Sequence, residues 1–256
     1  MMLLLVAFGV GTIIGSFLNV CIARLPRSES VVFPPSHCPH CNSRIRSWDN
    51  IPLVSYLLLR GRCRACHRRI SLRYPAVELL SGLLALLLVQ RFDLSPALAV
   101  AGVFVAALIV VSFIDLDHQI IPDVISLPGI VVGVLLSALG YGPPLLDSII
   151  GVLCGGGILF AVAAGYQALT GREGMGGGDI KLLAMIGAFL GWRAVLLTLV
   201  LGSFSGALVG IALMVTRGAT TRLPIPFGPF LACGAVCALF FGDALINWYL
   251  HLALPA

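Results

Sequence analysis

Acidic residues are scarce in this sequence, which holds 8 Asp and 3 Glu among its 256 residues. Charged residues of both signs make up only 11% of the chain, whereas 59% of the residues are hydrophobic. This is far below the roughly 25% of charged residues in soluble globular domains, so the composition excludes that class. It predicts an all-α polytopic membrane protein.

The N-terminus lacks the features of a removable signal peptide. No basic residue precedes its apolar run, and no small-residue cleavage site follows it. We therefore expect the first apolar run to be a retained transmembrane helix.

About eight apolar runs have the composition of membrane helices. A helix needs about 20 residues to cross a hydrocarbon core about 30 Å thick. The run at 180–192 would cover only about 20 Å, so the sequence predicts a short helix there, in a thinned or water-filled region. The expected segments are 2–23, 76–90, 96–114, 124–140, 146–168, 180–192, 194–216 and 226–250.

Basic residues are concentrated in one polar stretch of the chain. Ten of the sixteen lie between Arg24 and Arg73, and the positive-inside rule places that stretch in the cytosol. Alternating helices then bring fourteen of the sixteen basic residues inside, and they also set Asp115 and Asp179 on the same face of the membrane. The other loops expected inside are 115–123, 169–179 and 217–225.

Four cysteines form two C-x2-C knuckles separated by 21 residues. Two such knuckles suit a tetrahedral zinc site in which each pair supplies ligands from one tight turn. Two disulfides are the alternative, but a cytosolic loop is a reducing environment that disfavours them. Four thiolates leave no open coordination position, so the predicted role of the zinc is structural. The predicted ligands are Cys38, Cys41, Cys63 and Cys66.

Basic side chains surround the second knuckle. We expect five arginines to offset the negative charge of a zinc tetrathiolate. Three nearby histidines could replace a cysteine, but they are more simply bystanders. The arginines are Arg60, Arg62, Arg64, Arg68 and Arg69, and the histidines are His37, His40 and His67.

Two short stretches place carboxylates beside apolar runs, where acidic groups are costly to keep. Asp115 lies in the stretch 113–123, and Asp179 follows three glycines at 176–178. Two nearby carboxylates can share one proton, so that one activates water while the other protonates a peptide carbonyl. Glycines would let an extended substrate approach the backbone closely. The alternative for Asp179 is the N-cap of a helix that begins at Ile180.

Taken together, these segments resemble the type IV prepilin peptidases, also called leader peptidase/N-methyltransferases. These enzymes belong to the membrane aspartyl proteases with a Gly-x-Gly-Asp motif. The resemblance runs over nearly the whole chain and rests on the order of several motifs. They are the stretches 15–20, 24–26, the paired knuckles, 48–52, 74–78, 113–123, 176–181 and 225–230.

The resemblance implies that Asp115 and Asp179 are the catalytic pair, with Gly176, Gly178 and Lys181 beside the approaching substrate. The implied reaction is cleavage of prepilins and pseudopilins after the glycine that closes a short basic leader. It takes place on the cytosolic side of the bacterial inner membrane.

The family also implies N-methylation of the new N-terminal residue, with S-adenosylmethionine as the methyl donor. The chain has no Gly-rich βαβ signature for that cofactor. The stretch 48–52, Glu78 and Gly82 are only guesses for its contacts.

The implied organisation has three parts: a first transmembrane helix at 1–24, a cytosolic zinc-binding loop at 25–75 and a transmembrane aspartyl protease core at 76–256. The expected partners are prepilin or pseudopilin substrates and the lipid bilayer, with no nucleic acid. The resemblance suits pilus, secretion and DNA-uptake systems alike, and it leaves the oligomeric state open.

Two other classes of protein stay open on the residues alone. A transporter or channel could use Asp115 and Asp179 to relay protons or ions, but a zinc-bearing loop and a Gly-Gly-Gly-Asp entry are not expected there. An assembly scaffold could recruit a partner through the zinc knuckles, but it would give the aspartates no role.

Overall fold

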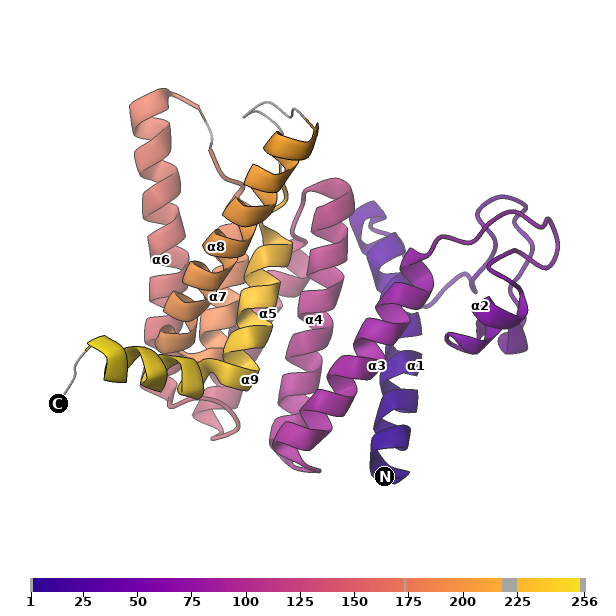
Figure 1. Ribbon diagram of the computed structural model, residues 1–256, viewed down its shortest axis with the longest axis horizontal. Coiled ribbons are helices and arrows are strands. Elements are labelled where there is room, and N and C mark those ends of the chain that lie inside the picture. Colours follow the sequence, from indigo (N-terminus) through magenta and orange to yellow (C-terminus); the bar gives the residue numbers. More distant parts are fainter. Residues whose placement is uncertain (1, 173, 218–224, 254–256) are drawn as a thin grey trace. The chain divides into compact units, whose positions relative to one another are not determined.

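The computed structural model describes residues 2–172, 174–217 and 225–253. These ranges are helical, and the loop between the first two long helices adds two isolated β-bridges (Figure 1). The loop expected at 217–225 falls largely outside them. The helices are α1 (Met2–Arg24), η1 (Leu25–Arg27), η2 (Ser47–Asn50), α2 (Val54–Leu58), α3 (Arg73–Phe92), α4 (Pro96–His118), α5 (Asp123–Ala138), α6 (Leu145–Thr170), α7 (Gly177–Leu190), α8 (Trp192–Arg217) and α9 (Gly228–Ala253).

Each of the eight expected apolar segments forms a helix. Six of them, α1, α3, α4, α6, α8 and α9, are long and apolar enough to cross a membrane. The other two, α5 and α7, have 16 and 14 residues. At 1.5 Å per residue α7 extends only about 21 Å, so the prediction of a short helix in this region is confirmed. A single residue, Gly191 at φ 81°, separates α7 from α8.

The chain divides into two compact units, Met1–Val110 and Val111–Ala256, with the boundary inside α4. In the first unit α1 and α3 pack against each other through two glycines of α1. A Cβ atom on Gly15 would lie 2.8 Å from the Cα of Glu78, and one on Gly11 would lie 2.7 Å from the carbonyl oxygen of Ser81. Only glycine lets the two backbones approach this closely.

Hydrogen bonds tie α1, α3 and the intervening loop together. The side-chain amide of Asn19 in α1 donates to the carbonyl of Tyr74 at 3.0 Å. The backbone N–H of Leu53 donates to the carboxylate of Glu78 at 2.8 Å. Glu78 lies in the second turn of α3, so the loop is held against the side of a membrane helix.

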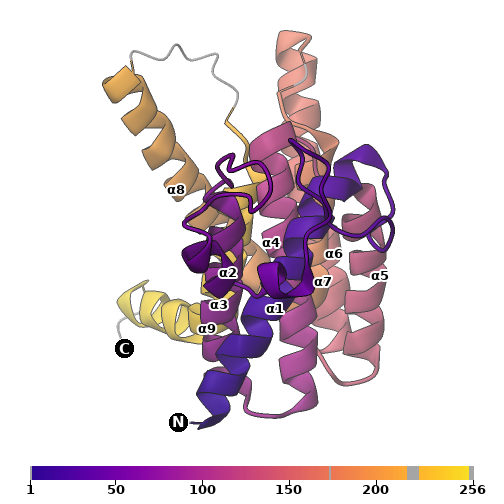
Figure 2. The same ribbon diagram turned by 90° about the vertical axis from the view of Figure 1, so that its right-hand side faces the viewer.

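In the second unit α7 packs against α5, α6, α8 and α9 and forms the centre of the bundle (Figures 1 and 2). Every residue from 182 to 189 is buried. Glycines of α6 let this helix approach α7, since a Cβ atom on Gly155 would lie 2.5 Å from the carbonyl oxygen of Leu183. Ser148 in α6 also donates to the carbonyl of Ala188 at 2.8 Å. The short helix is therefore fixed on several sides.

Candidate functional site

The loop between α1 and α3 brings four cysteine side chains together. Their Sγ atoms all lie within 4.8 Å of one another, and those of Cys38 and Cys66 are 3.9 Å apart. Tetrahedral zinc with Zn–S bonds of about 2.3 Å separates its sulfurs by about 3.8 Å, so this spacing fits one ion. None of the cysteines forms a disulfide. The structure thus assembles the predicted set Cys38, Cys41, Cys63 and Cys66, which could hold a metal ion.

The two knuckles are the same tight turn, used twice. The carbonyl of Cys38 accepts the N–H of Asn42, and that of Cys63 accepts the N–H of His67, both at 2.9 Å. Asn42 and His67 both have φ 55°, and an isolated β-bridge closes the base of each turn. This repeated geometry points both cysteine pairs at one position.

Hydrogen bonds within the knuckles favour the thiolate form of two ligands. The hydroxyl and backbone N–H of Ser43 lower the pKa of Cys41 to about 6. The backbone N–H groups of Cys66 and Ala65 lower the pKa of Cys63. Because a metal binds deprotonated thiols, these contacts ease metal binding near neutral pH.

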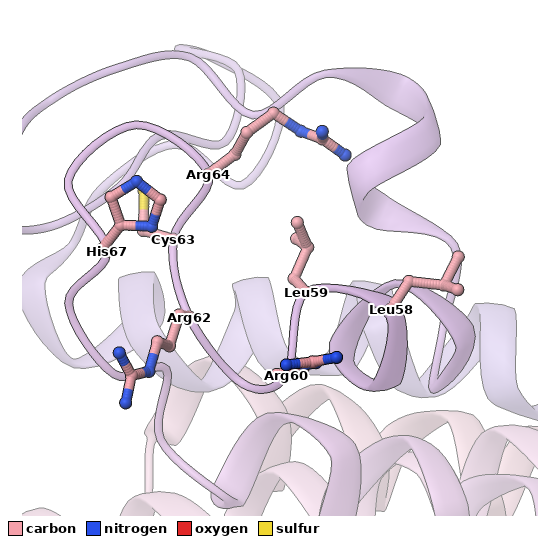
Figure 3. Close-up of a pocket in the computed structure, with 7 residues that line it drawn as sticks. All are labelled: Leu58, Leu59, Arg60, Arg62, Cys63, Arg64 and His67. Carbon is pink, nitrogen blue, oxygen red and sulfur yellow. The ribbon is translucent and has the colours of Figure 1, made fainter.

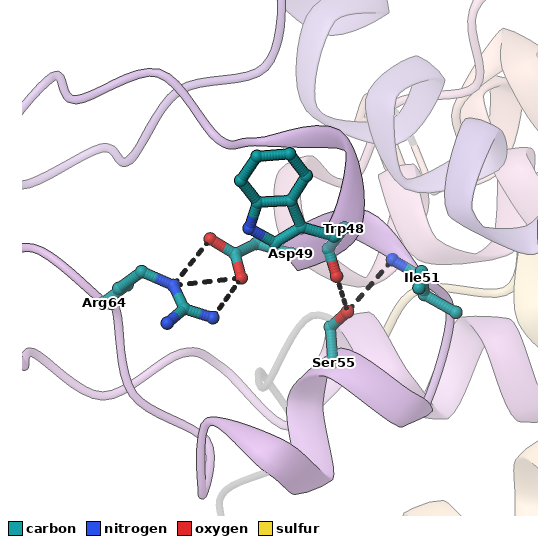
Figure 4. Close-up of polar contacts among 5 residues, drawn as sticks. All are labelled: Trp48, Asp49, Ile51, Ser55 and Arg64. Atoms are coloured by element: carbon teal, nitrogen blue, oxygen red, sulfur yellow. Dashed lines mark hydrogen bonds and ion pairs between the residues drawn. The ribbon is translucent and has the colours of Figure 1, made fainter.

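Arg64 in the second knuckle pairs with Asp49 (Figure 4). Its guanidinium makes three hydrogen bonds of 2.6–3.1 Å to both carboxylate oxygens. This contact lowers the pKa of Asp49. Asp49 thus partners one of the five arginines expected to offset the cluster charge, and that expectation stays a prediction. The pair also fastens η2 to the second knuckle.

A cavity of about 530 Å³ opens beside the second knuckle (Figure 3). Its lining is basic and partly apolar and has no carboxylate, so an acid–base pair for peptide hydrolysis must lie elsewhere. The lining residues are Leu58, Leu59, Arg60, Arg62, Cys63, Arg64 and His67.

Asp115 and Asp179 come together in the second unit. Asp115 lies in the last turn of α4, and Asp179 is the third residue of α7. The two carboxylates are near enough for their charges to interact. Asp115 is only 5% exposed, and one oxygen of Asp179 is buried with no hydrogen-bond partner among the described residues. The two predicted residues therefore form a pair partly shielded from water.

The start of α9 supports Asp115 through Gly228. Sequence reasoning missed this supporting residue. The N–H of Gly228 donates to Asp115 Oδ2 at 2.9 Å. A Cβ atom on Gly228 would lie 2.7 Å from the same oxygen, so only glycine fits without displacing the carboxylate. The stretch 225–230 had entered the family resemblance without a role, and its Pro-Phe-Gly-Pro pattern at a helix start was the available signal.

Asp179 does not cap its helix. Helix α7 begins at Gly177, with Gly176 at the N-cap position and no side-chain capping bond. The N-cap interpretation of Asp179 is therefore wrong. Its carboxylate instead lies in the first turn, where the partial positive charge of the helix N-terminus favours an anion.

Gly178 and Lys181 fix α7 against the segment that follows α4. A Cβ atom on Gly178 would lie 2.8 Å from the Cβ of Ile121. Lys181 Nζ pairs with the carboxylate of Asp123 at 2.7 and 2.9 Å. Asp123 begins α5 directly after Pro122. At Gly176 an added Cβ would meet nothing within 4 Å, so this glycine leaves open space beside the pair.

Comparisons with known proteins bear on both sites. The family described as "Bacterial Peptidase A24 N-terminal domain" matches residues 10–92, and the "Type IV leader peptidase family" matches residues 102–211. A prepilin leader peptidase/N-methyltransferase of Aeromonas hydrophila is 43% identical over 261 aligned residues, which cover 93% of this chain and 90% of the relative. The chain belongs to the type IV leader peptidase family.

Other relatives of this leader peptidase family member carry the same name. That of Aeromonas salmonicida is 40% identical over 266 residues, covering 94% of this chain and 91% of the relative. The relative from Pseudomonas aeruginosa is 38% identical over 266 residues, which cover 95% of this chain and 92% of the relative. No solved structure matches the chain. The four cysteines lie within the first matched family region, and the two aspartates lie within the second.

We predict that Gly228→Ala lowers peptidase activity about 100-fold. The added methyl group displaces the Asp115 carboxylate and weakens its bond to the backbone, and a misplacement of about 1 Å can cost that much. The rate is measured on purified protein of normal yield. Gly242→Ala is the matched control in the same helix, because a Cβ there meets nothing within 4 Å. Equal rates for the two variants contradict the supporting role of Gly228.

Proposed function

We propose that this protein cleaves the leader peptide from type IV prepilins and pseudopilins by an aspartyl protease mechanism and then N-methylates the new N-terminal residue. The observation that carries the proposal is the shielded pair of Asp115 and Asp179 at the meeting point of α4 and α7. Two fully hydrated carboxylates could both stay ionised at little cost. Here both side chains are partly withdrawn from water. That arrangement suits two carboxylates that share one proton.

The chemistry assigns complementary roles to the two aspartates. The ionised carboxylate takes a proton from water as the water attacks the peptide carbonyl, and the protonated carboxyl donates to the carbonyl oxygen. Gly228 holds one oxygen of Asp115 in place through its N–H. The open backbone at Gly176 gives an extended leader peptide room beside Asp179.

Zinc is the metal that best suits the cysteine cluster. Four Sγ atoms within 4.8 Å of one another fill a tetrahedral coordination shell, which gives a structural site with no position left for substrate. When bound, the ion cross-links the two knuckles of the loop. No step of peptide cleavage uses it.

S-adenosylmethionine is the proposed methyl donor, because the relatives are named N-methyltransferases as well as leader peptidases. The described part of the chain has no parallel βαβ unit. The methyl donor therefore binds in a way different from the Gly-rich βαβ cofactor folds, and we assign no residue to it.

We propose that the protein lies in the bacterial inner membrane with the loop and the aspartates on the cytosolic side. The support is the charge count, in which fourteen of sixteen basic residues then share the inside. A reporter fused after Arg46 should register as cytosolic, and one fused after Tyr141 as external. The reverse pattern contradicts this orientation.

The direct test uses purified protein in detergent, a leader-bearing prepilin and labelled S-adenosylmethionine. We expect a size shift of the prepilin and transfer of label to the shortened product only. A prepilin in which the glycine before the cleavage site is replaced is the matched control and should stay uncut. Intact prepilin after incubation with folded, metal-containing protein contradicts the proposal and favours a proton relay or a scaffold.

A further inference from the structure

The short helix α2 presents an apolar face to the outside of the first unit. Leu57 and Leu58 are 74% and 77% exposed, and Val54 is 48% exposed. The three residues are spaced i, i+3 and i+4, so they share one side of the helix. Exposed apolar side chains of this size, grouped together, mark an interaction surface.

The opposite side of α2 is bound to the loop, which fixes the direction of the apolar face. Ser55 Oγ donates to the carbonyl of Trp48 at 2.8 Å and accepts the N–H of Ile51 at 3.0 Å (Figure 4). Tyr56 donates to the carbonyl of Ile70. The helix cannot turn its leucines inward without losing these contacts.

The position of α2 along the membrane helices argues for lipid as the occupant. The N–H of Leu53, directly before α2, donates a hydrogen bond to Glu78. Glu78 lies five residues, or about 7.5 Å, along α3 from its start. Glu78 in turn contacts Gly15, nine residues or about 13.5 Å before the end of α1. The start of α2 thus lies beside the two spanning helices and not beyond their ends (Figure 1). Interfacial helices bury their apolar face about 5–10 Å deep.

The charge around α2 complements a lipid surface. Arg60 and Arg62 lie two and four residues after the end of α2 and are exposed, and Figure 3 shows Arg60 on the same side of the pocket as Leu58 and Leu59. Arg46 lies over the ring of Trp48, 5.6 Å from its centroid, and Trp48 itself is 60% exposed. Tryptophan and arginine are typical of the membrane interface, where anionic headgroups attract basic side chains.

We propose that α2 is an interfacial helix that inserts Val54, Leu57 and Leu58 among the acyl chains of the leaflet on the side of the loop. Arg60 and Arg62 bind the phosphate groups of anionic phospholipids there. The loop that carries the cysteine cluster is thereby held down on the membrane. This surface is independent of the cleavage reaction.

The test reads the depth of α2 with one tryptophan. In the full chain Trp48, Trp192 and Trp248 are replaced by Phe, and Leu57→Trp supplies the reporter. The protein is reconstituted in vesicles of equal parts phosphatidylcholine and phosphatidylglycerol with brominated acyl chains. We expect quenching at least about twofold stronger than for a Glu29→Trp reporter, which is exposed and lies past the end of α1. Leu58→Trp is the second reporter, used if Leu57→Trp lowers the metal content.

Each other outcome overturns part of the proposal. Equal quenching of both reporters, with emission typical of water, shows that the face is solvated. Blue-shifted but unquenched emission that grows with the protein-to-lipid ratio shows that a second copy covers it. We expect quenching to fall when phosphatidylglycerol is omitted, and also in the double variant Arg60→Gln with Arg62→Gln. If either change leaves the quenching unchanged, the proposal that these arginines bind anionic phospholipids is wrong.

Discussion

Asp115→Asn and Asp179→Asn should each lower the rate of leader cleavage by about 10⁴-fold, the upper range for loss of general acid–base catalysis. Each variant keeps the size and polarity of the side chain but cannot cycle a proton. The two residues serve different halves of one step, so neither can replace the other, and the double variant should be no worse than the single ones. The measurement is the single-turnover cleavage rate of a prepilin by purified protein.

The control for the aspartate variants is Asp117→Asn, two residues from Asp115 on the same helix, which should cost much less. All three variants should keep normal yield and metal content. The native enzyme should lose activity at both extremes of pH, since the pair needs one protonated and one ionised member. Appreciable cleavage by Asp179→Asn contradicts the mechanism.

Cys38→Ser and Cys66→Ser should abolish metal binding and unfold the loop between α1 and α3. From residue 25 to residue 72, a stretch described throughout, Cys38 is the only buried hydrophobic side chain. Structural zinc sites supply roughly 10–16 kcal/mol of apparent binding free energy, which so small a core cannot replace. Elemental analysis should find about one zinc per native chain and much less in the variants. Limited proteolysis should cut the loop of the variants first.

Cysteines outside the cluster provide the matched controls for this experiment. Cys154→Ser and Cys233→Ser remove thiols from α6 and α9 and should leave the metal content unchanged. A native protein that contains no metal, with four reactive thiols and a protease-resistant loop, contradicts the structural role of the ion.

The helices and the cysteine cluster could be predicted from the sequence, because both depend on simple patterns. Apolar runs of bilayer length predicted where helices lie, and the C-x2-C spacing predicted which thiols meet. The cost of acidic groups beside apolar runs drew attention to two stretches, the family resemblance singled out Asp115 and Asp179 within them, and the structure brings these two residues together. Their catalytic role stays a prediction that the variants above test.

Contacts between distant segments could not be predicted in the same way. The support of Asp115 by Gly228 joins residues 113 positions apart, and no local pattern encodes such a partner. The start of α7 was misplaced because glycines favour an irregular backbone by propensity, whereas Gly177 and Gly178 form its first turn and Gly178 packs on Ile121. The pairing of Arg64 with Asp49, fifteen residues away, was likewise not predicted.

The bond between Gly228 and Asp115 also orders events during synthesis of the protein. The aspartate of α4 leaves the ribosome more than one hundred residues before the glycine that holds it. At about 5–20 residues per second, this difference of 113 residues delays the complete site by about 6–23 seconds. A nascent chain that has inserted α4 and α7 therefore has both carboxylates but lacks the bond from Gly228. If the pair acts as proposed, we expect peptidase activity only once the last helix enters the membrane.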